Sequence, residues 1–301
     1  MTMKKLLTAE TKRRLTFPLL WLEVLTIILL NYYNILQSGF GFTVTSSSFL
    51  YENTIVLCIL ITLNCTLHLR GEREYGTLSA KMYLGYSKKS VYLAEAITSV
   101  FECLLLWITD IAATFICCAI AHYDFEITPK LFITAISYLA LLCSVSQLTN
   151  ALSMTLSSHA LALLIIVAIT GFLLYYGGEI THGIIQPKRT DVFFMDGKMH
   201  DNPLYISGAN RFWYKLELML SPYTQACYLP HLLNQSKGEI TATSFRFFSN
   251  LLPYHMELIF INVLECFIFT FIGKKFFKKG ICNKTLSSSL KDELLTKTSI
   301  L

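Results

Sequence analysis

The sequence predicts an all-α integral membrane protein with six transmembrane helices. Six long apolar runs are each near the ~20 residues that a helix needs to cross a bilayer, and basic residues gather at alternate ends of these runs. Composition agrees, because the chain is 53% hydrophobic and 15% charged, with a mean hydropathy of +0.51. The runs span 17–36, 50–69, 97–121, 131–156, 159–177 and 254–272.

Lysine and arginine residues predict how the chain is oriented. Segments 1–16, 70–90 and 274–301 hold five, five and seven of them, whereas the connections after the first and third runs together hold one, Lys130. Short loops rich in these residues stay in the cytoplasm, so we expect both tails and segment 70–90 to be cytoplasmic. The basic residues behind the net charge of +5 are then expected beside the headgroups of membrane lipids, and no nucleic-acid partner is expected.

The amino-terminal segment 1–16 precedes the first span. Its leucines, Leu6, Leu7 and Leu15, are separated by charged residues, which is typical of an amphipathic helix lying on the cytoplasmic face. A partly ordered basic tail is the alternative interpretation. Pro18 then fits the first turn of the first span, where a missing N–H costs little.

Segment 70–90 has the punctuation of short helices separated by breaks. Gly76 can end one helix in a left-handed conformation, and Thr77 can cap the next. Gly85 can end that second helix, and Ser87 can cap the start of the third span. The sequence therefore predicts two short cytoplasmic helices between spans two and three.

The second half of the chain combines a very short and a very long connection. Only residues 157–159 join the fourth and fifth runs, which forces a tight antiparallel pair. Segment 179–253 is external by parity, and its apolar pieces are too short to span, so we expect re-entrant or interfacial helices. A small external helical cap is the alternative. The pieces are Phe212–Leu220, Tyr223–Leu233 and Phe245–Leu252.

One stretch carries a family resemblance. Residues 72–77 read E-x-E-x-G-T, residues 81–88 read K-M-x-x-G-x-S-K, and a spanning helix follows. This pattern resembles the coupling-helix region of type-2 ABC exporter permeases. The resemblance covers the single permease domain 1–301: a basic interface helix, six spans with both ends inside, a tight turn between spans four and five, and an apolar segment with Ser221-Pro222-Tyr223 before the last span.

The resemblance implies a transport subunit, neither an enzyme nor a holder of its own cofactor. The chain agrees in lacking the phosphate-binding pattern G-x-x-x-x-G-K-S/T. ATP and Mg would bind to cytoplasmic ABC ATPase subunits, and a second copy or a related permease would complete the transporter. Residues Glu72, Glu74, Tyr75, Gly76 and Thr77 would lie in the ATPase cleft; a solvated charged loop is the alternative interpretation.

The resemblance also implies a multi-pass protein of the bacterial cell (inner) membrane that exports a peptide, lipid or hydrophobic drug, or confers immunity to it. Acidic residues inside the spans are expensive and usually face protein or water. Glu102, Asp110 and Glu265 are candidates for a path that takes a cationic substrate, or are neutral or paired. Glu95 is expected to be cytoplasmic, Glu257 to lie at the outer interface, and Glu23 to be neutral or paired.

An alternative class is an ATP-independent secondary transporter that uses these acids, or a membrane-embedded sensor or assembly factor. The seven histidines have no metal-ligand spacing such as H-E-x-x-H, so no metal site is expected. No catalytic constellation is expected either.

Overall fold

The computed structural model describes residues 3–38, 53–122, 129–156, 159–186, 188–190, 200–234 and 254–280. Within them, six helices are long and apolar enough to cross a membrane, so the chain is an all-α multi-pass membrane protein. These helices are α2 (Pro18–Ser38), α3 (Thr54–Glu74), α5 (Lys88–Ile120), α6 (Pro129–Thr155), α7 (His159–Ile185) and α11 (Tyr254–Gly280).

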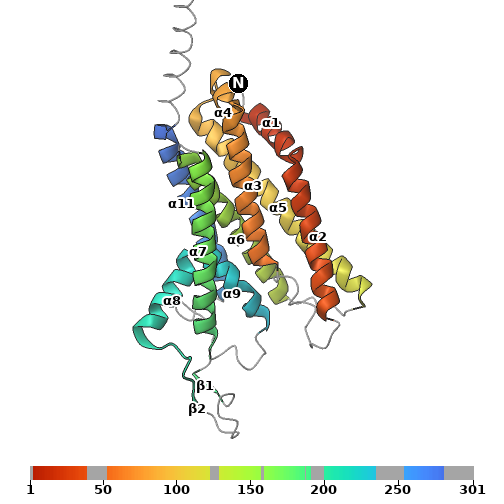
Figure 1. The fold of residues 1–301 in the computed structure, drawn as a ribbon, viewed down its shortest axis with the longest axis vertical. Helices are drawn as coiled ribbons and strands as arrows, with labels where there is room; N and C mark the ends of the chain where they lie inside the picture. The colour runs from red at the N-terminus through yellow and green to blue at the C-terminus, as the bar shows by residue number, and fades with distance from the viewer. Residues whose placement is uncertain are drawn as a thin grey trace, which may run out of the picture.

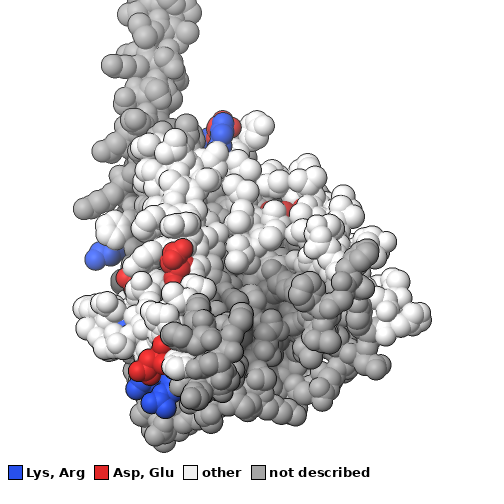
Figure 2. Space-filling view, turned by 60° about the horizontal axis from the view of Figure 1, so that its bottom comes forward, with Lys and Arg blue, Asp and Glu red and all other residues white. Residues whose placement is uncertain are grey.

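Helices α3 and α6 form the centre of the bundle. More than half of the span in each is buried, against 22% for α7. Helix α6 packs against α11, α3 and α5, and α2 packs against α5 on the other side (Figure 1). The outer faces of the long helices are apolar, as on Trp21, Leu25 and Leu29 of α2, which suits contact with lipid. The described surface at the end opposite α1 carries few charges, most of them at one side (Figure 2).

The amino-terminal segment folds into α1 (Met3–Leu15), which is separated from α2 by a break at Thr16 and Phe17. Pro18 begins α2, as predicted. Helix α1 packs against α5 and buries Leu6, Glu10 and Arg14, while Leu15 is 42% exposed. Its buried face therefore combines Leu6 with two ionisable residues.

Only one short helix, α4 (Thr77–Tyr83), lies between the second and third spans. The expectation of two was wrong, because α3 continues without interruption to Glu74, where an Arg70–Glu74 ion pair of 2.7 Å joins successive turns. Both predicted glycine breaks are confirmed, with φ of +68° at Gly76 and +89° at Gly85. Ser87 caps α5, its hydroxyl accepting from the backbone N–H of Ser90 at 3.1 Å.

Helix α7 extends beyond residue 177 to Ile185, so the connection to the last span begins later than predicted. Two strands of two residues each follow, and β1 (Arg189–Thr190) pairs antiparallel with β2 (His200–Asp201). Helices α8 (Gly208–Leu220) and α9 (Pro222–Asn234) then form a helical hairpin against the bundle (Figure 1).

The turn between α8 and α9 lies deep among the long helices. The hydroxyl of Tyr223 is 2.8 Å from that of Thr62 and 3.2 Å from that of Thr170, two residues near the middle of α3 and α7. Gln225 accepts a hydrogen bond from Asn262 of α11 at 2.7 Å. Phe245–Leu252, the turn at 157–158 and residues 281–301 of the carboxyl tail lie outside the described residues.

Candidate functional site: a buried ionic cluster

Ionisable side chains from four helices converge at the α1 end of the bundle. Seven of them are at most 7% exposed, and Arg13 is 34% exposed. We call this set the ionic cluster; it consists of Glu10, Arg13 and Arg14 of α1, His68 and Glu72 of α3, Lys81 of α4, and Glu95 and Glu102 of α5.

Lys81 lies at the centre of the ionic cluster. Its ammonium Nζ is 2.8 Å from Glu10, 2.5 Å from Glu72 and 2.8 Å from Glu95. An ammonium has three donors, so each hydrogen has a carboxylate acceptor from a different helix. One side chain of α4 therefore connects this short helix to α1, α3 and α5.

The two arginines of α1 complete the charge pairing. Arg13 donates to Glu10 at 2.8 Å and also pairs with Glu72. Arg14 pairs with Glu102 and lies 3.2 Å from Glu95, so it bridges two carboxylates on one face of α5. Helix α1 is thus attached to its neighbours through charge-assisted hydrogen bonds as well as through Leu6.

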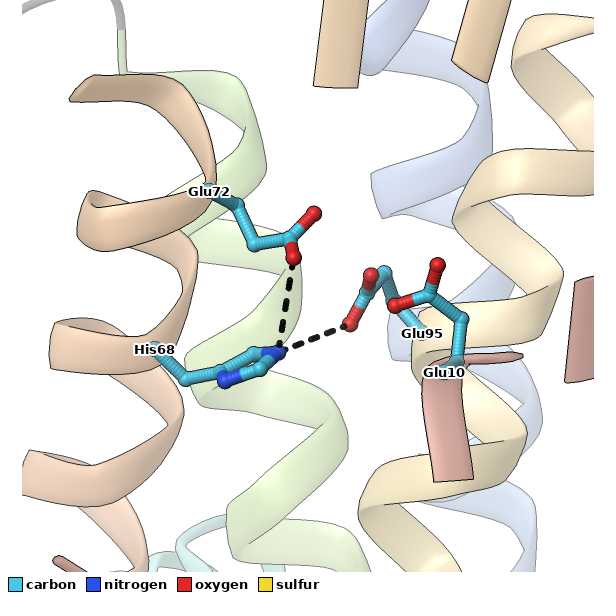
Figure 3. Close-up of side chains that lie close together, drawn as sticks. All are labelled: Glu10, His68, Glu72 and Glu95. Carbon is cyan, nitrogen blue, oxygen red and sulfur yellow. Dashed lines mark ion pairs between the residues drawn. The ribbon is translucent and has the colours of Figure 1, made fainter. Parts of the chain in front are cut away.

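The side chains of Glu10, His68, Glu72 and Glu95 point toward one another (Figure 3). Their ligand atoms lie within 4.8 Å of one another, a grouping close enough for a metal ion. The ammonium of Lys81 already lies among the three carboxylates, however, and Arg13 and Arg14 bind further oxygens of the same groups. The described geometry is therefore an internal ion-pair network, with His68 Nε2 3.8 Å from Glu95.

The ionic cluster contains four carboxylates and, with His68 neutral, three cations. Burial raises the pKa of Glu10 to about 7, and the charge of Glu95 adds to this effect. Burial alone would lower the pKa of Lys81, but Glu95, Glu72 and Glu10 outweigh it and raise the pKa. Lys81 therefore stays charged near neutral pH, and Glu10 is where a proton can balance the excess negative charge.

A buried ion-pair network of this kind joins its helices firmly without adding much net stability. Desolvation offsets most of the attraction between the charges, yet removal of one partner typically costs ~3–5 kcal/mol because the others remain buried and uncompensated. The arrangement can therefore hold α1, α3, α4 and α5 in one fixed geometry at this end of the bundle.

Some of the predicted coupling residues are exposed and others are buried. Tyr75 is 85% exposed, and Glu74 is exposed and paired with Arg70. Glu72 was expected to project toward a partner but is buried in the ionic cluster. Thr77 donates from its hydroxyl to the carbonyl of Glu72 at 2.7 Å, on the far side of Gly76. Their role in coupling stays a prediction.

The three acids of the predicted substrate path lie in three separate places. Glu102 belongs to the ionic cluster. Asp110 is fully buried, where Asn31 and Asn53 donate to one of its oxygens and Tyr138 to the other. Glu265 accepts from Ser144 of α6 at 2.8 Å. Each has a donor within the chain, and a shared path for substrate stays a prediction.

Sequence reasoning missed most of the ionic cluster. Glu10 and Arg14 are four apart and so share one face of α1, and Glu95 and Glu102 are seven apart on α5. The second spacing indicated a shared face, which the structure bears out, but Glu95 was expected in the cytoplasm and not in a buried cluster. The spacing within α1 was the available signal for a charged buried face.

Comparison with known proteins adds no relative. No protein-family model matches the chain, and no curated protein matches its sequence. The functional interpretation therefore depends on the residues and geometry of this chain.

Proposed function

We propose that this chain is the permease subunit of an ATP-driven exporter of the ABC type, acting with separate ATPase subunits. The observation that carries the proposal is the placement of α4. Its outer side bears residues suited to contact with another protein, and its inner side is bound through Lys81 to three further helices.

The outer side of α4 and its flanks carry large exposed side chains. Tyr75, Tyr83 and Leu84 are 85%, 82% and 60% exposed. They follow α3 or lie at the end of α4, outside the six candidate spans. Tyrosine is enriched at the centres of protein interfaces, and apolar groups held out in water favour a protein partner. We call these three residues the α4 tip.

The inner side of α4 supplies the mechanical link. A partner that presses on the α4 tip would move Lys81 and, through its three carboxylates, α1, α3 and α5. Such a group of helices can rock as a rigid body against α6, α7 and α11, as alternating access requires. Glu72 then acts inside the permease as part of this link, while Glu74 and Tyr75 are available to the partner.

The remaining features fit the same proposal. The α1 end would face the cytoplasm with both termini, and α1 would lie at the membrane edge as an interface helix. The α8–α9 hairpin would re-enter the membrane from outside, because Tyr223 contacts the middle of α3 and α7. A second copy or related permease would complete the path for a peptide, lipid or hydrophobic drug in a bacterial cell membrane.

Copurification tests the proposal. The tagged chain should retain an ATPase from its native membrane, and the double variant Tyr75→Ala, Tyr83→Ala should retain at least tenfold less. The control Tyr175→Ala removes an equally large side chain, 72% exposed, from the span α7, and should retain the ATPase fully. Equal retention by the double variant and the wild type would rule out the α4 tip as the docking site.

A further inference from the structure

A groove of about 810 Å³ runs along α1 on the side next to its ionic face. Lys4, Leu7, Thr11 and Leu15 follow one another at helical spacing along it, and Phe101 of α5 closes the far side. We call this feature the α1–α5 groove. Phe101 is 57% exposed within the span α5, so the groove opens toward lipid.

The groove combines an apolar floor with a basic rim. Leu7, Leu15 and Phe101 supply the floor. Lys4 and Lys12 supply positive charge, and among the described residues no acidic side chain lines the groove, since Glu10 and Glu95 are turned into the ionic cluster. A ligand that fits this arrangement has a negatively charged head and an apolar tail.

A second groove gives a useful contrast. It measures about 520 Å³ between α2 and α3 and is lined by Leu22, Leu67, Arg70 and Glu74. Its basic residue is already paired with its acidic residue at 2.7 Å. That groove therefore lacks the unbalanced positive charge of the α1–α5 groove, although it lies at the same end of the bundle.

We propose that the α1–α5 groove binds one anionic phospholipid of the leaflet at the α1 end. The phosphate would meet Lys4 and Lys12 at headgroup level, and an acyl chain would lie along Leu15 and Phe101. The indole N–H of Trp21 donates to the carbonyl of Leu15 at 2.8 Å. Because tryptophan indoles favour the headgroup region, this contact supports a position of the groove at headgroup level. The site would tie the position of α1 to the charge of the membrane.

Fluorescence quenching by brominated lipids tests the proposal on the full chain. The sequence has three tryptophans, and replacing Trp107 and Trp213 by Phe leaves Trp21 beside the groove as the reporter. The protein is placed in vesicles in which brominated phosphatidylglycerol or brominated phosphatidylcholine replaces the plain lipid. A headgroup attraction of ~1 kcal/mol per lysine corresponds to about fivefold in affinity for each lysine. With two lysines we therefore expect the anionic lipid to quench Trp21 with an affinity up to ~25-fold higher.

Matched variants separate a built site from general attraction to a basic protein. Lys4→Gln, Lys12→Gln should remove the preference, whereas Lys5→Gln, Lys89→Gln, at exposed lysines outside the groove, should keep it. Phe101→Ala should weaken quenching by both lipids, and Phe132→Ala, a similarly exposed phenylalanine on α6, should not. Equal loss of preference in both lysine pairs, or equal quenching by the two lipids with the unmodified groove, would overturn the proposal.

Discussion

The ammonium of Lys81 lies 2.8 Å from the carboxylate of Glu10, although Glu10 precedes the first span and Lys81 follows the second. The same ammonium binds Glu72 and Glu95, so one side chain unites three helices. Helix α4 is short and carries the exposed α4 tip, so under the proposed function Lys81 is the residue through which a partner's force would reach the bundle.

Lys81→Met should destabilise the protein by ~3–5 kcal/mol, because three buried carboxylates would lose a shared cation. Lys89→Met, at an exposed position at the start of α5, should change the free energy of unfolding by no more than ~0.5 kcal/mol. Denaturant unfolding in detergent measures both. Similar small changes in the two variants would show that the ionic cluster is not held together as described.

Glu10 gives the ionic cluster a pH dependence. Its pKa is raised from 4.5 to about 7, so between these values the folded state holds a proton that the unfolded state has released. Its contribution to stability therefore falls as the pH rises from about 4.5 to about 7 and is flat above. Glu10→Gln removes this titration, so the variant should gain stability relative to wild type across that range.

Thermal unfolding at several pH values between 5 and 8 measures this difference. Lys5→Gln changes the charge of the same helix at an exposed position and serves as the control. If the wild type instead became more stable relative to Glu10→Gln as the pH rises, the result would contradict the burial of Glu10 in the ionic cluster.

Gly273 allows α11 to approach α5 closely. A methyl group at Gly273 would lie 2.0 Å from the hydroxyl oxygen of Tyr92, which is 1% exposed. Gly273→Ala should therefore cost ~1–3 kcal/mol through overpacking. Gly178→Ala on α7 meets open space and should be neutral or slightly stabilising.

A double variant checks the cause of that cost. In a Tyr92→Ala background the added methyl group finds room, so Gly273→Ala should cost little more than Tyr92→Ala alone. An additive loss in the double variant would mean that the two residues do not meet.

Accessibility labelling tests the proposed orientation, which follows from the seventeen-to-one sorting of lysine and arginine between the two sets of connections. In a background with Cys282→Ser, Ala80→Cys on α4 should react with an impermeant maleimide only from the cytoplasm. Asp201→Cys, at the exposed strand β2, should react only from outside. Reaction of both from one side would be incompatible with six spans.

The spans could be predicted because each depends on local composition. An apolar run of sufficient length and a proline or glycine at its end suffice to place α2, α5 and α6 and the breaks at Gly76 and Gly85. The sequence predicted two short helices before Gly85, where the structure has one. The first is absent because α3 continues to Glu74, which pairs with Arg70 one turn earlier on the same helix.

The ionic cluster could not be predicted in the same way. Whether Glu72 faces water or Lys81 depends on the tertiary position of α4, where Lys81 also meets Glu10 of α1 and Glu95 of α5; no local pattern specifies that position. Likewise Glu95 is near the end of its span by sequence, yet it is fully buried because α1 covers it with Arg14. Tertiary contacts between helices distant in sequence decided both positions.

The central claim is that ATP-driven force enters this chain from a separate subunit, and the mass of the intact complex tests it most directly. The chain, extracted from its own membrane with surrounding lipid, should give a complex that contains nucleotide-binding subunits in a fixed ratio to it. That complex should lose those subunits when Tyr75 and Tyr83 are both replaced by alanine. A complex of permease chains alone, in the wild type and under the same extraction, would contradict the claim.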